Sequence, residues 1–221
     1  MDDLAKLCLY RRGVYIVLYA DDILLLAPSV GELHNLLESC EVELDLIDMA
    51  INIKKSCCIR IGPRNHVGCT PISCASGISL PWVGEIRYLG IFIVRSRVFR
   101  CSLDHPKKGF YRSANAIFGK VGRIASEEVV LQLLNSKCIP VLLYGLEACS
   151  LLKSDLTSLD FVIVRFLMKL FNTNNMDIIN NCCYYFDVKL PSTLWSDRVI
   201  RFEKKFAECN NSFCKITASV R

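Results

Sequence analysis

Two adjacent acidic residues, Asp21 and Asp22, stand in the middle of an otherwise apolar stretch of the chain. They follow the run Val14–Tyr19 and precede the run Ile23–Ala27, both rich in β-branched, aromatic and aliphatic residues. Burying one unpaired carboxylate costs several kcal/mol even after its surroundings relax. We therefore expect the two acids either on a tight turn at the protein surface or in contact with a cation.

A hydrophobic strand, a turn that carries both aspartates and a second hydrophobic strand would meet both conditions. The composition of the run before Asp21 is typical of a β-strand. Carboxylate oxygens are the ligands that Mg²⁺ prefers, and two such ions can clamp the attacking and leaving oxygens of a phosphoryl transfer. The alternative is a buried strand or helix whose acids are exposed by chance. A membrane-spanning helix is not expected, because the run is too short and has two charges at its centre.

The composition is that of a folded protein. The chain has 221 residues, of which 52% are hydrophobic, and its mean hydropathy of +0.32 excludes a disordered chain. Asp2 and Asp3 stand where a signal peptide would carry positive charge, so we expect an intracellular protein that is not secreted.

The 13 cysteines are an odd number and contain no C-x-x-C pair. We expect them to be reduced and mostly buried, without structural disulfides. The cluster that most resembles a metal site is His66, Cys69 and Cys74, with Cys57 and Cys58 upstream. Its spacing fits no zinc pattern well, so a loop with small buried thiols is favoured over a zinc site.

Charge is distributed unevenly along the chain. Residues 1–50 hold ten acidic and three basic residues, whereas residues 87–125 hold nine basic and one acidic residue. Aromatic residues are interleaved with the basic block, which makes it a candidate phosphate-contacting surface. A solvated basic face with aromatic residues in the core is the alternative.

The residues after the acidic pair predict a helix and several short strands. Ser29, with Glu32 three positions later, predicts a capped helix that ends near Ala50. A short strand is expected at residues 57–61, followed by loops or weak hairpins up to residue 80. Residues 85–94 predict a strand or a pair of strands with a bend at Gly90.

From about residue 104 onward the pattern is helical, which makes the fold class α+β with a boundary near residue 100. Ser126 can cap a helix that is interrupted at Pro140, and Ser154 or Asp155 can cap a strongly periodic helix. The first helical stretch follows residue 104, the helix capped at Ser154 or Asp155 ends at an Asn-rich turn at residues 172–175, and further helices are expected over residues 141–152, around residues 177–185 and from residue 192 to about residue 207.

The order of three motifs is more specific than any one of them. Residues 19–22 read Tyr-Ala-Asp-Asp, residues 52–56 fit the pattern Asn-x-x-Lys-Ser, and residues 88–90 read Tyr-Leu-Gly. In this order the chain resembles the C-terminal part of a reverse transcriptase from a non-LTR (LINE-type, Jockey-like) retrotransposon. The helical remainder is similar to the thumb and post-polymerase region of such elements.

The resemblance implies an activity and a domain organisation. Residues 1–100 would be a partial polymerase palm, with the acidic hairpin, a helix and short strands. Residues 101–221 would be a helical thumb and C-terminal region. The activity implied is RNA-directed DNA polymerisation, in which two Mg²⁺ or Mn²⁺ ions act on an RNA template, a DNA primer and a deoxynucleotide.

The resemblance also implies residue roles. Asp21 and Asp22 would be catalytic metal ligands, and Lys55 would stabilise charge at the leaving pyrophosphate, with Lys54 as the rival candidate. The nucleic-acid-binding residues would be Tyr19 beneath the primer end, Tyr88, Leu89 and Gly90 along the primer strand, and Lys108, Arg112, Lys120 and Arg123 on the thumb.

Such a polymerase also needs an aspartate on an earlier palm strand and a fingers region, yet only 18 residues precede Tyr19. Asp2 and Asp3 are too close to serve as that strand. We therefore expect a truncated element that is inactive as an isolated chain. The alternatives are a non-catalytic nucleic-acid-binding remnant, a remnant that does not fold stably, and a helical interaction protein with a coincidental acidic turn.

Overall fold

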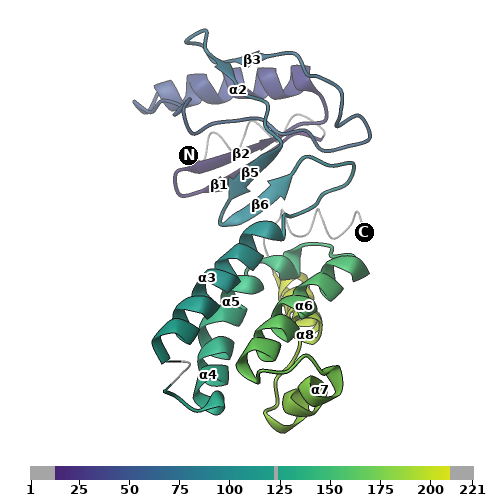
Figure 1. The fold of residues 1–221 in the computed structure, drawn as a ribbon. Helices are drawn as coiled ribbons and strands as arrows, with labels where there is room; N and C mark the ends of the chain where they lie inside the picture. Colours follow the sequence, from purple (N-terminus) through teal and green to yellow (C-terminus); the bar gives the residue numbers. More distant parts are fainter. Residues whose placement is uncertain (1–12, 122–123, 210–221) are drawn as a thin grey trace. The chain divides into compact units, whose positions relative to one another are not determined.

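The computed structural model describes residues 13–121 and 124–209, which form two compact units (Figure 1). The first unit contains the described residues up to Ile86 together with Val94–Val98. The second contains Arg87–Ile93 and the described residues from Phe99 onward. The strands described form two-stranded sheets and most helices follow them in the chain, so the predicted α+β class is confirmed.

The first unit begins with the expected hairpin. Strand β1 (Tyr15–Tyr19) pairs antiparallel with β2 (Asp22–Leu26), in a register that runs from Tyr15 opposite Leu26 to Tyr19 opposite Asp22. Alternate side chains of the two strands, including Ile16, Leu18, Ile23 and Leu25, pack on one cluster with the helix that follows. The other face of the hairpin carries the intervening residues, as the period of two in a strand requires.

Helix α2 (Val30–Asp45) covers this hairpin through Leu36, Cys40 and Leu44. Ser29 is its N-cap, and the Ser29 hydroxyl accepts a hydrogen bond from the Glu32 amide at 3.2 Å. The helix ends at Asp45, whereas the sequence predicted an end near Ala50. Asp48 takes a left-handed φ of +54°, and the Met49 amide donates to the Leu44 carbonyl at 2.9 Å, which closes the helix early.

The strand expected at residues 57–61 is reduced to one bridge. Cys58 pairs in parallel with Trp82, donating its amide hydrogen to the Pro81 carbonyl at 2.9 Å. Extending this ladder toward residue 56 would need an N–H at Pro81, which proline lacks. The weak hairpin expected before residue 80 is present as β3 (Ile72–Ser73) and β4 (Ser79–Leu80).

Strands β5 (Glu85–Tyr88) and β6 (Ile91–Val94) form the hairpin predicted at residues 85–94. Its two turn residues, Leu89 and Gly90, have φ of +47° and +84°. Positive φ at both central positions is the requirement of the two-residue turn whose twist suits a hairpin. The bend expected at Gly90 is therefore this turn.

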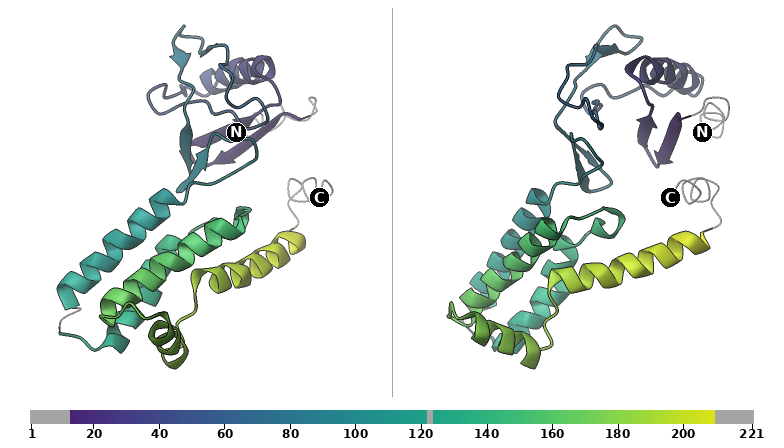
Figure 2. Two further views of the ribbon diagram at one scale, coloured as in Figure 1. Left: turned by 45° about the vertical axis from the view of Figure 1, so that its right-hand side comes forward. Right: turned by 90° about the vertical axis from the view of Figure 1, so that its right-hand side faces the viewer.

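The second unit is a helical bundle built on one core (Figure 2). Its largest fully buried side chains include Phe110, Leu134, Leu142, Leu159 and Ile163. No helix among the described residues is long and apolar enough to cross a membrane. The helical segments are α3 (Asp104–Val121), α4 (Glu127–Leu133), the π-helical η1 (Leu134–Cys138), α5 (Ile139–Leu142), the 3₁₀-helical η2 (Leu146–Ala148), α6 (Lys153–Leu170), α7 (Met176–Tyr185) and α8 (Pro191–Glu208).

The single buried helix expected over residues 141–152 is wrong. Helix α5 ends at Leu142, and the chain turns at Gly145, whose φ is +67°. A Cβ atom at Gly145 would lie 2.5 Å from Cδ1 of Ile91, so the position combines a left-handed backbone with a close approach. Apolar composition alone does not reveal such a break.

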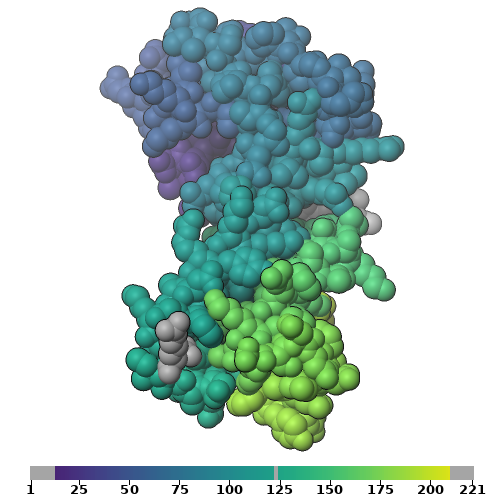
Figure 3. All heavy atoms as spheres, in the orientation of Figure 1, coloured from purple at the N-terminus to yellow at the C-terminus, as the bar shows by residue number. Residues whose placement is uncertain are grey.

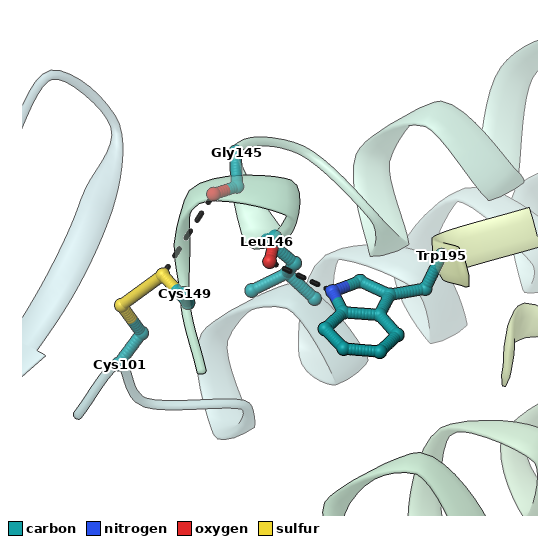
Figure 4. The surroundings of a disulfide bond; sticks show 5 residues. All are labelled: Cys101, Gly145, Leu146, Cys149 and Trp195. Atoms are coloured by element: carbon teal, nitrogen blue, oxygen red, sulfur yellow. Dashed lines mark hydrogen bonds between the residues drawn. A yellow bond between two sulfur atoms is a disulfide. The ribbon is translucent and has the colours of Figure 1, made fainter. Parts of the chain in front are cut away.

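The expectation that the chain has no disulfide is also wrong, because a disulfide joins Cys101 and Cys149 (Figure 4). The backbone of Cys101 forms an isolated antiparallel β-bridge with Ile93 of β6, and Cys149 directly follows η2. Trp195 of α8 holds the same segment, since its indole N–H donates to the Leu146 carbonyl at 2.8 Å (Figure 4). The 48-residue separation of the two cysteines explains why no spacing pattern predicted the bond.

Candidate functional site

The two aspartates lie on the tight turn of the β1–β2 hairpin. Ala20 and Asp21 are the loop residues, and Asp22 begins β2 opposite Tyr19. Asp21, Asp22 and Tyr19 are all exposed, and 62% of the Tyr19 surface is accessible to solvent. Exposure on a surface turn, one of the two placements expected from the sequence, avoids the desolvation cost of the carboxylates.

Ala20 adopts a left-handed backbone with φ of +51°. Few non-glycine residues enter this region, and doing so costs an L-residue roughly 1–2 kcal/mol. The turn between two paired strands imposes it, so the acidic pair is held on a strained and geometrically defined loop.

The donor set for a metal ion at this turn is incomplete. Two carboxylates are suitable oxygen ligands for Mg²⁺ or Mn²⁺. However, among the residues that the structure describes, no group of three or more His, Cys, Asp or Glu side chains is arranged to hold an ion. The residues present therefore do not fit a complete two-metal site, and no catalytic step is derived through one.

The Asn52–Ser56 segment forms a turn in the first unit. The amides of Lys55 and Ser56 both donate to the Asn52 carbonyl at 3.0 Å. Both Lys54 and Lys55 are exposed, so their ammonium groups are accessible to an anion. Exposure does not distinguish the two candidates for the pyrophosphate-side lysine.

The Tyr88–Gly90 segment packs on a residue that the sequence analysis did not select. The Tyr144 hydroxyl donates to the Leu89 carbonyl at 3.3 Å. A Cβ atom at Gly90 would lie 3.0 Å from Cε1 of Tyr144 on a backbone with φ of +84°, so glycine is favoured where the turn rests on this ring. Tyr144 immediately precedes the left-handed Gly145, and a Tyr-Gly pair within an apolar run is the one signal that marks it.

Beside this turn lies a hollow of about 610 Å³ within the second unit, lined in part by Leu89, Gly90, Tyr144 and Pro140. An aromatic stack borders it. The Phe92 ring lies parallel to His105, with ring centroids 3.5 Å apart, and the Arg87 guanidinium lies 5.7 Å from the Phe92 centroid.

Helix α3 presents the predicted basic residues to solvent. Lys108, Arg112 and Lys120 are exposed, and the first two share a helix face because they are four residues apart. Lys107 instead has a structural role, since its ammonium donates to the Ser158 hydroxyl of α6 at 2.9 Å. The fourth predicted residue, Arg123, lies outside the described residues.

Three thiols of the cysteine-rich segment in the first unit, those of Cys57, Cys58 and Cys74, have raised pKa values. Burial, together with the nearby Cys57, Cys74 and Cys69, raises the pKa of Cys58 to about 11. Burial likewise raises the pKa of Cys74, to which Glu41 contributes. Thiols with raised pKa values are poor nucleophiles and poor metal ligands.

The structure places Asp21, Asp22 and Lys55 in the first unit, and Tyr88, Leu89, Gly90 and the basic residues of α3 in the second. A scan against protein-family models, a search of curated proteins and a search of solved structures each found no match to this chain. Any assignment of a class of protein therefore rests on the motifs and on the geometry of each unit.

Proposed function

We propose that this chain is part of an RNA-directed DNA polymerase of the non-LTR retrotransposon kind, comprising the second half of the palm and the thumb. The observation that carries the proposal is the β1–β2 hairpin, which is covered from one face by α2 and exposes Asp21 in its two-residue turn and Asp22 at the start of β2. A polymerase palm needs carboxylates on such a rigid base to hold the metal ions of nucleotidyl transfer.

The other motifs take roles that suit their exposure. Lys55, or its neighbour Lys54, would meet the negative charge of the pyrophosphate, which demands an accessible cation. The turn at Leu89 and Gly90 would guide the primer strand, and its backbone is open to close approach except where Tyr144 packs. The exposed basic residues of α3 would contact template–primer phosphates.

The isolated chain should not polymerise DNA. Two-metal chemistry requires more carboxylate ligands than the pair on this turn, and the described residues bring no third acidic ligand to it. The chain would therefore retain binding of nucleic acid and lack DNA synthesis.

A primer-extension assay tests both properties on the full chain. With an RNA template, an annealed DNA primer, deoxynucleotides and either Mg²⁺ or Mn²⁺, we expect a stable but salt-sensitive complex and no extension product. Robust Mg²⁺-dependent extension would show that the metal site is complete. Failure to bind the primer–template would contradict the proposal that the helical second unit is a thumb.

A second candidate is a nucleic-acid-binding module without any metal-dependent role. The exposure of Lys108, Arg112 and Lys120 on one helix supports it, because these cations suffice for phosphate contact. The two candidates differ at the acidic turn. The module predicts binding to an RNA–DNA duplex that is indifferent to Asp21→Ala with or without Mn²⁺, whereas the polymerase-derived proposal predicts that Mn²⁺ strengthens the complex only while Asp21 is present.

A further inference from the structure

A groove of about 660 Å³ runs between helices α3 and α6 of the second unit. Helices α3 and α6 contact each other and lie side by side in the left-hand ribbon view (Figure 2), and the space-filling view shows teal and green surfaces of the second unit adjoining (Figure 3). The floor of the groove is apolar, because Ala114 and Phe166 are buried at 1% and 6% exposure. None of the residues assigned to the acidic turn or to the Tyr88–Gly90 segment lines it.

The rim of the groove carries two exposed aromatic rings, one from each helix. Tyr111 of α3 is 37% exposed and Phe161 of α6 is 54% exposed. Exposing a phenylalanine ring to this extent is unfavourable in water. The ring of Tyr111 lies edge-on to the buried ring of Phe110, with centroids 5.7 Å apart.

Two cations line the groove, Arg165 beside the ring of Phe161 and Lys169 beside the ring of Phe118, which is not itself a lining residue. The Arg165 guanidinium is 5.8 Å from the Phe161 centroid, and the Lys169 ammonium is 4.5 Å from the Phe118 centroid and 3.3 Å from Oδ1 of Asn115. The other polar lining residues are amides and a hydroxyl, from Asn115, Asn172, Thr173 and Asn174, and no carboxylate is among the lining residues. The lining therefore carries positive charge, next to hydrogen-bonding groups that are neutral.

We infer that this groove binds single-stranded nucleic acid. Exposed aromatic faces beside cations are the combination that holds unpaired bases and their phosphates, since every base has a face to stack and every nucleotide carries a negative charge. A duplex does not offer its base faces, so the rings favour a single strand over paired template and primer. The inference does not require a functional acidic turn, and it goes beyond the polymerase-derived proposal.

Fluorescence anisotropy of the full chain with a labelled oligouridylate of about 12 nucleotides tests this inference. Phe161→Ala should weaken binding by about tenfold, the effect expected from the loss of one base-stacking platform. Phe161→Trp should retain or strengthen binding, because it keeps an aromatic face. Lys169→Gln should make the slope of log affinity against log salt concentration shallower, by about the amount that one phosphate contact contributes.

Tyr184→Ala is the matched control, because Tyr184 is 82% exposed on α7 and does not line the groove. It should leave the affinity unchanged. The inference is overturned if Phe161→Ala and Phe161→Trp bind as the unaltered chain does, or if Tyr184→Ala weakens binding equally.

Two further outcomes would assign the groove to a different occupant and overturn the inference. One is concentration-dependent self-association in sedimentation velocity that Phe161→Ala abolishes, which would indicate a second copy of the chain. The other is displacement of the oligonucleotide by an acidic peptide at equal charge concentration, which would indicate charge recognition without stacking. A primer–template duplex measured in parallel keeps this result separate from the thumb assignment.

Discussion

Single residues decide what the acidic turn can do. Asp21 and Asp22 are both exposed, and the left-handed Ala20 sits directly before them. A run of apolar residues around two acids is compatible with a buried helix or a surface turn, and the strand pairing from Tyr15 to Leu26 resolves this choice. Two exposed carboxylates form a weak site for a divalent ion, because few ligands are supplied by the protein.

Mn²⁺ should therefore bind weakly and locally at this turn. In an amide NMR spectrum of the full chain, we expect paramagnetic broadening centred on Ala20, Asp21 and Asp22. The double change Asp21→Asn and Asp22→Asn should abolish it, because amides are much weaker ligands than carboxylates. Broadening that is centred on Glu38 and Glu41 of α2 instead, or that survives the double change, would contradict the assignment.

The buried thiol of Cys58 should make the first unit sensitive to alkali. Its pKa is about 11 in the folded chain and near 9 when the thiol is solvated, so the unfolded chain loses this proton first. The contribution of this thiol to the free energy of unfolding is constant below about pH 9 and is lost as the pH rises from about 9 to 11. Urea unfolding at a series of pH values should show this fall, and Cys58→Ala should make it shallower. If the free energy of unfolding falls equally steeply with pH in both proteins, Cys58 is not the cause of the alkaline destabilisation.

Individual elements are fixed by contacts between segments that are distant in sequence. The turn at Gly145 is the clearest case, because it combines φ of +67° with an approach to Ile91 of the β5–β6 hairpin. Here the sequence predicted a continuous helix, and the backbone conformation required by packing overrode the apolar pattern.

Gly145→Ala should destabilise the second unit. The left-handed backbone alone costs about 1–2 kcal/mol with a Cβ atom present, and the contact with Ile91 adds to this cost. Gly119→Ala in α3 is the matched control, because nothing lies within 4 Å of its Cβ position. It should raise the free energy of unfolding by up to about 1 kcal/mol. Urea unfolding measures both, and similar changes for the two variants would contradict the role of Gly145.

The disulfide should stabilise the same region. Replacing Cys101 and Cys149 together by alanine should lower the free energy of unfolding by about 2–4 kcal/mol, the usual effect of removing such a cross-link. A reductant should produce a comparable loss in the unaltered chain and none in the double variant. Cys209→Ala is the control, since Cys209 is an exposed free thiol. Insensitivity of the unaltered chain to reductant would contradict a stabilising cross-link.

Patterns among neighbouring residues predicted most helices and strands well. The cap at Ser29 and the apolar, β-branched composition of β1 and β2 are properties of neighbouring residues, and the helices at residues 176–185 and 191–208 were expected within a residue or two. The packing of Tyr144 on Gly90, the Cys101–Cys149 bond and the α3–α6 groove join residues from separate segments. No spacing rule in the sequence encodes these contacts, so they could not be predicted.

At the scale of the whole molecule, charge separates along the chain. The acidic residues are concentrated before residue 50 and the basic residues in the segment 87–125, which includes α3. A basic helix with exposed Lys108, Arg112 and Lys120 is suited to phosphate contact, and its contribution is measurable without a catalytic assay.

The logarithm of the affinity of the full chain for an RNA–DNA primer–template should fall linearly with the logarithm of the salt concentration. Lys120→Gln should reduce the slope by about one, because each phosphate contact contributes about 0.9. Lys204→Gln in α8 provides an exposed control outside α3, and its slope should be unchanged. Equal slopes for all three proteins would place the phosphate contacts elsewhere.

The central claim is that Asp21 and Asp22 come from a polymerase palm. The most direct test is to sequence the transcript and genomic region upstream of the Met1 codon. We predict codons, in an open or interrupted frame, for a palm strand with a further aspartate and for a fingers region. Upstream sequence that encodes neither would contradict the claim and leave the acidic turn without a polymerase origin.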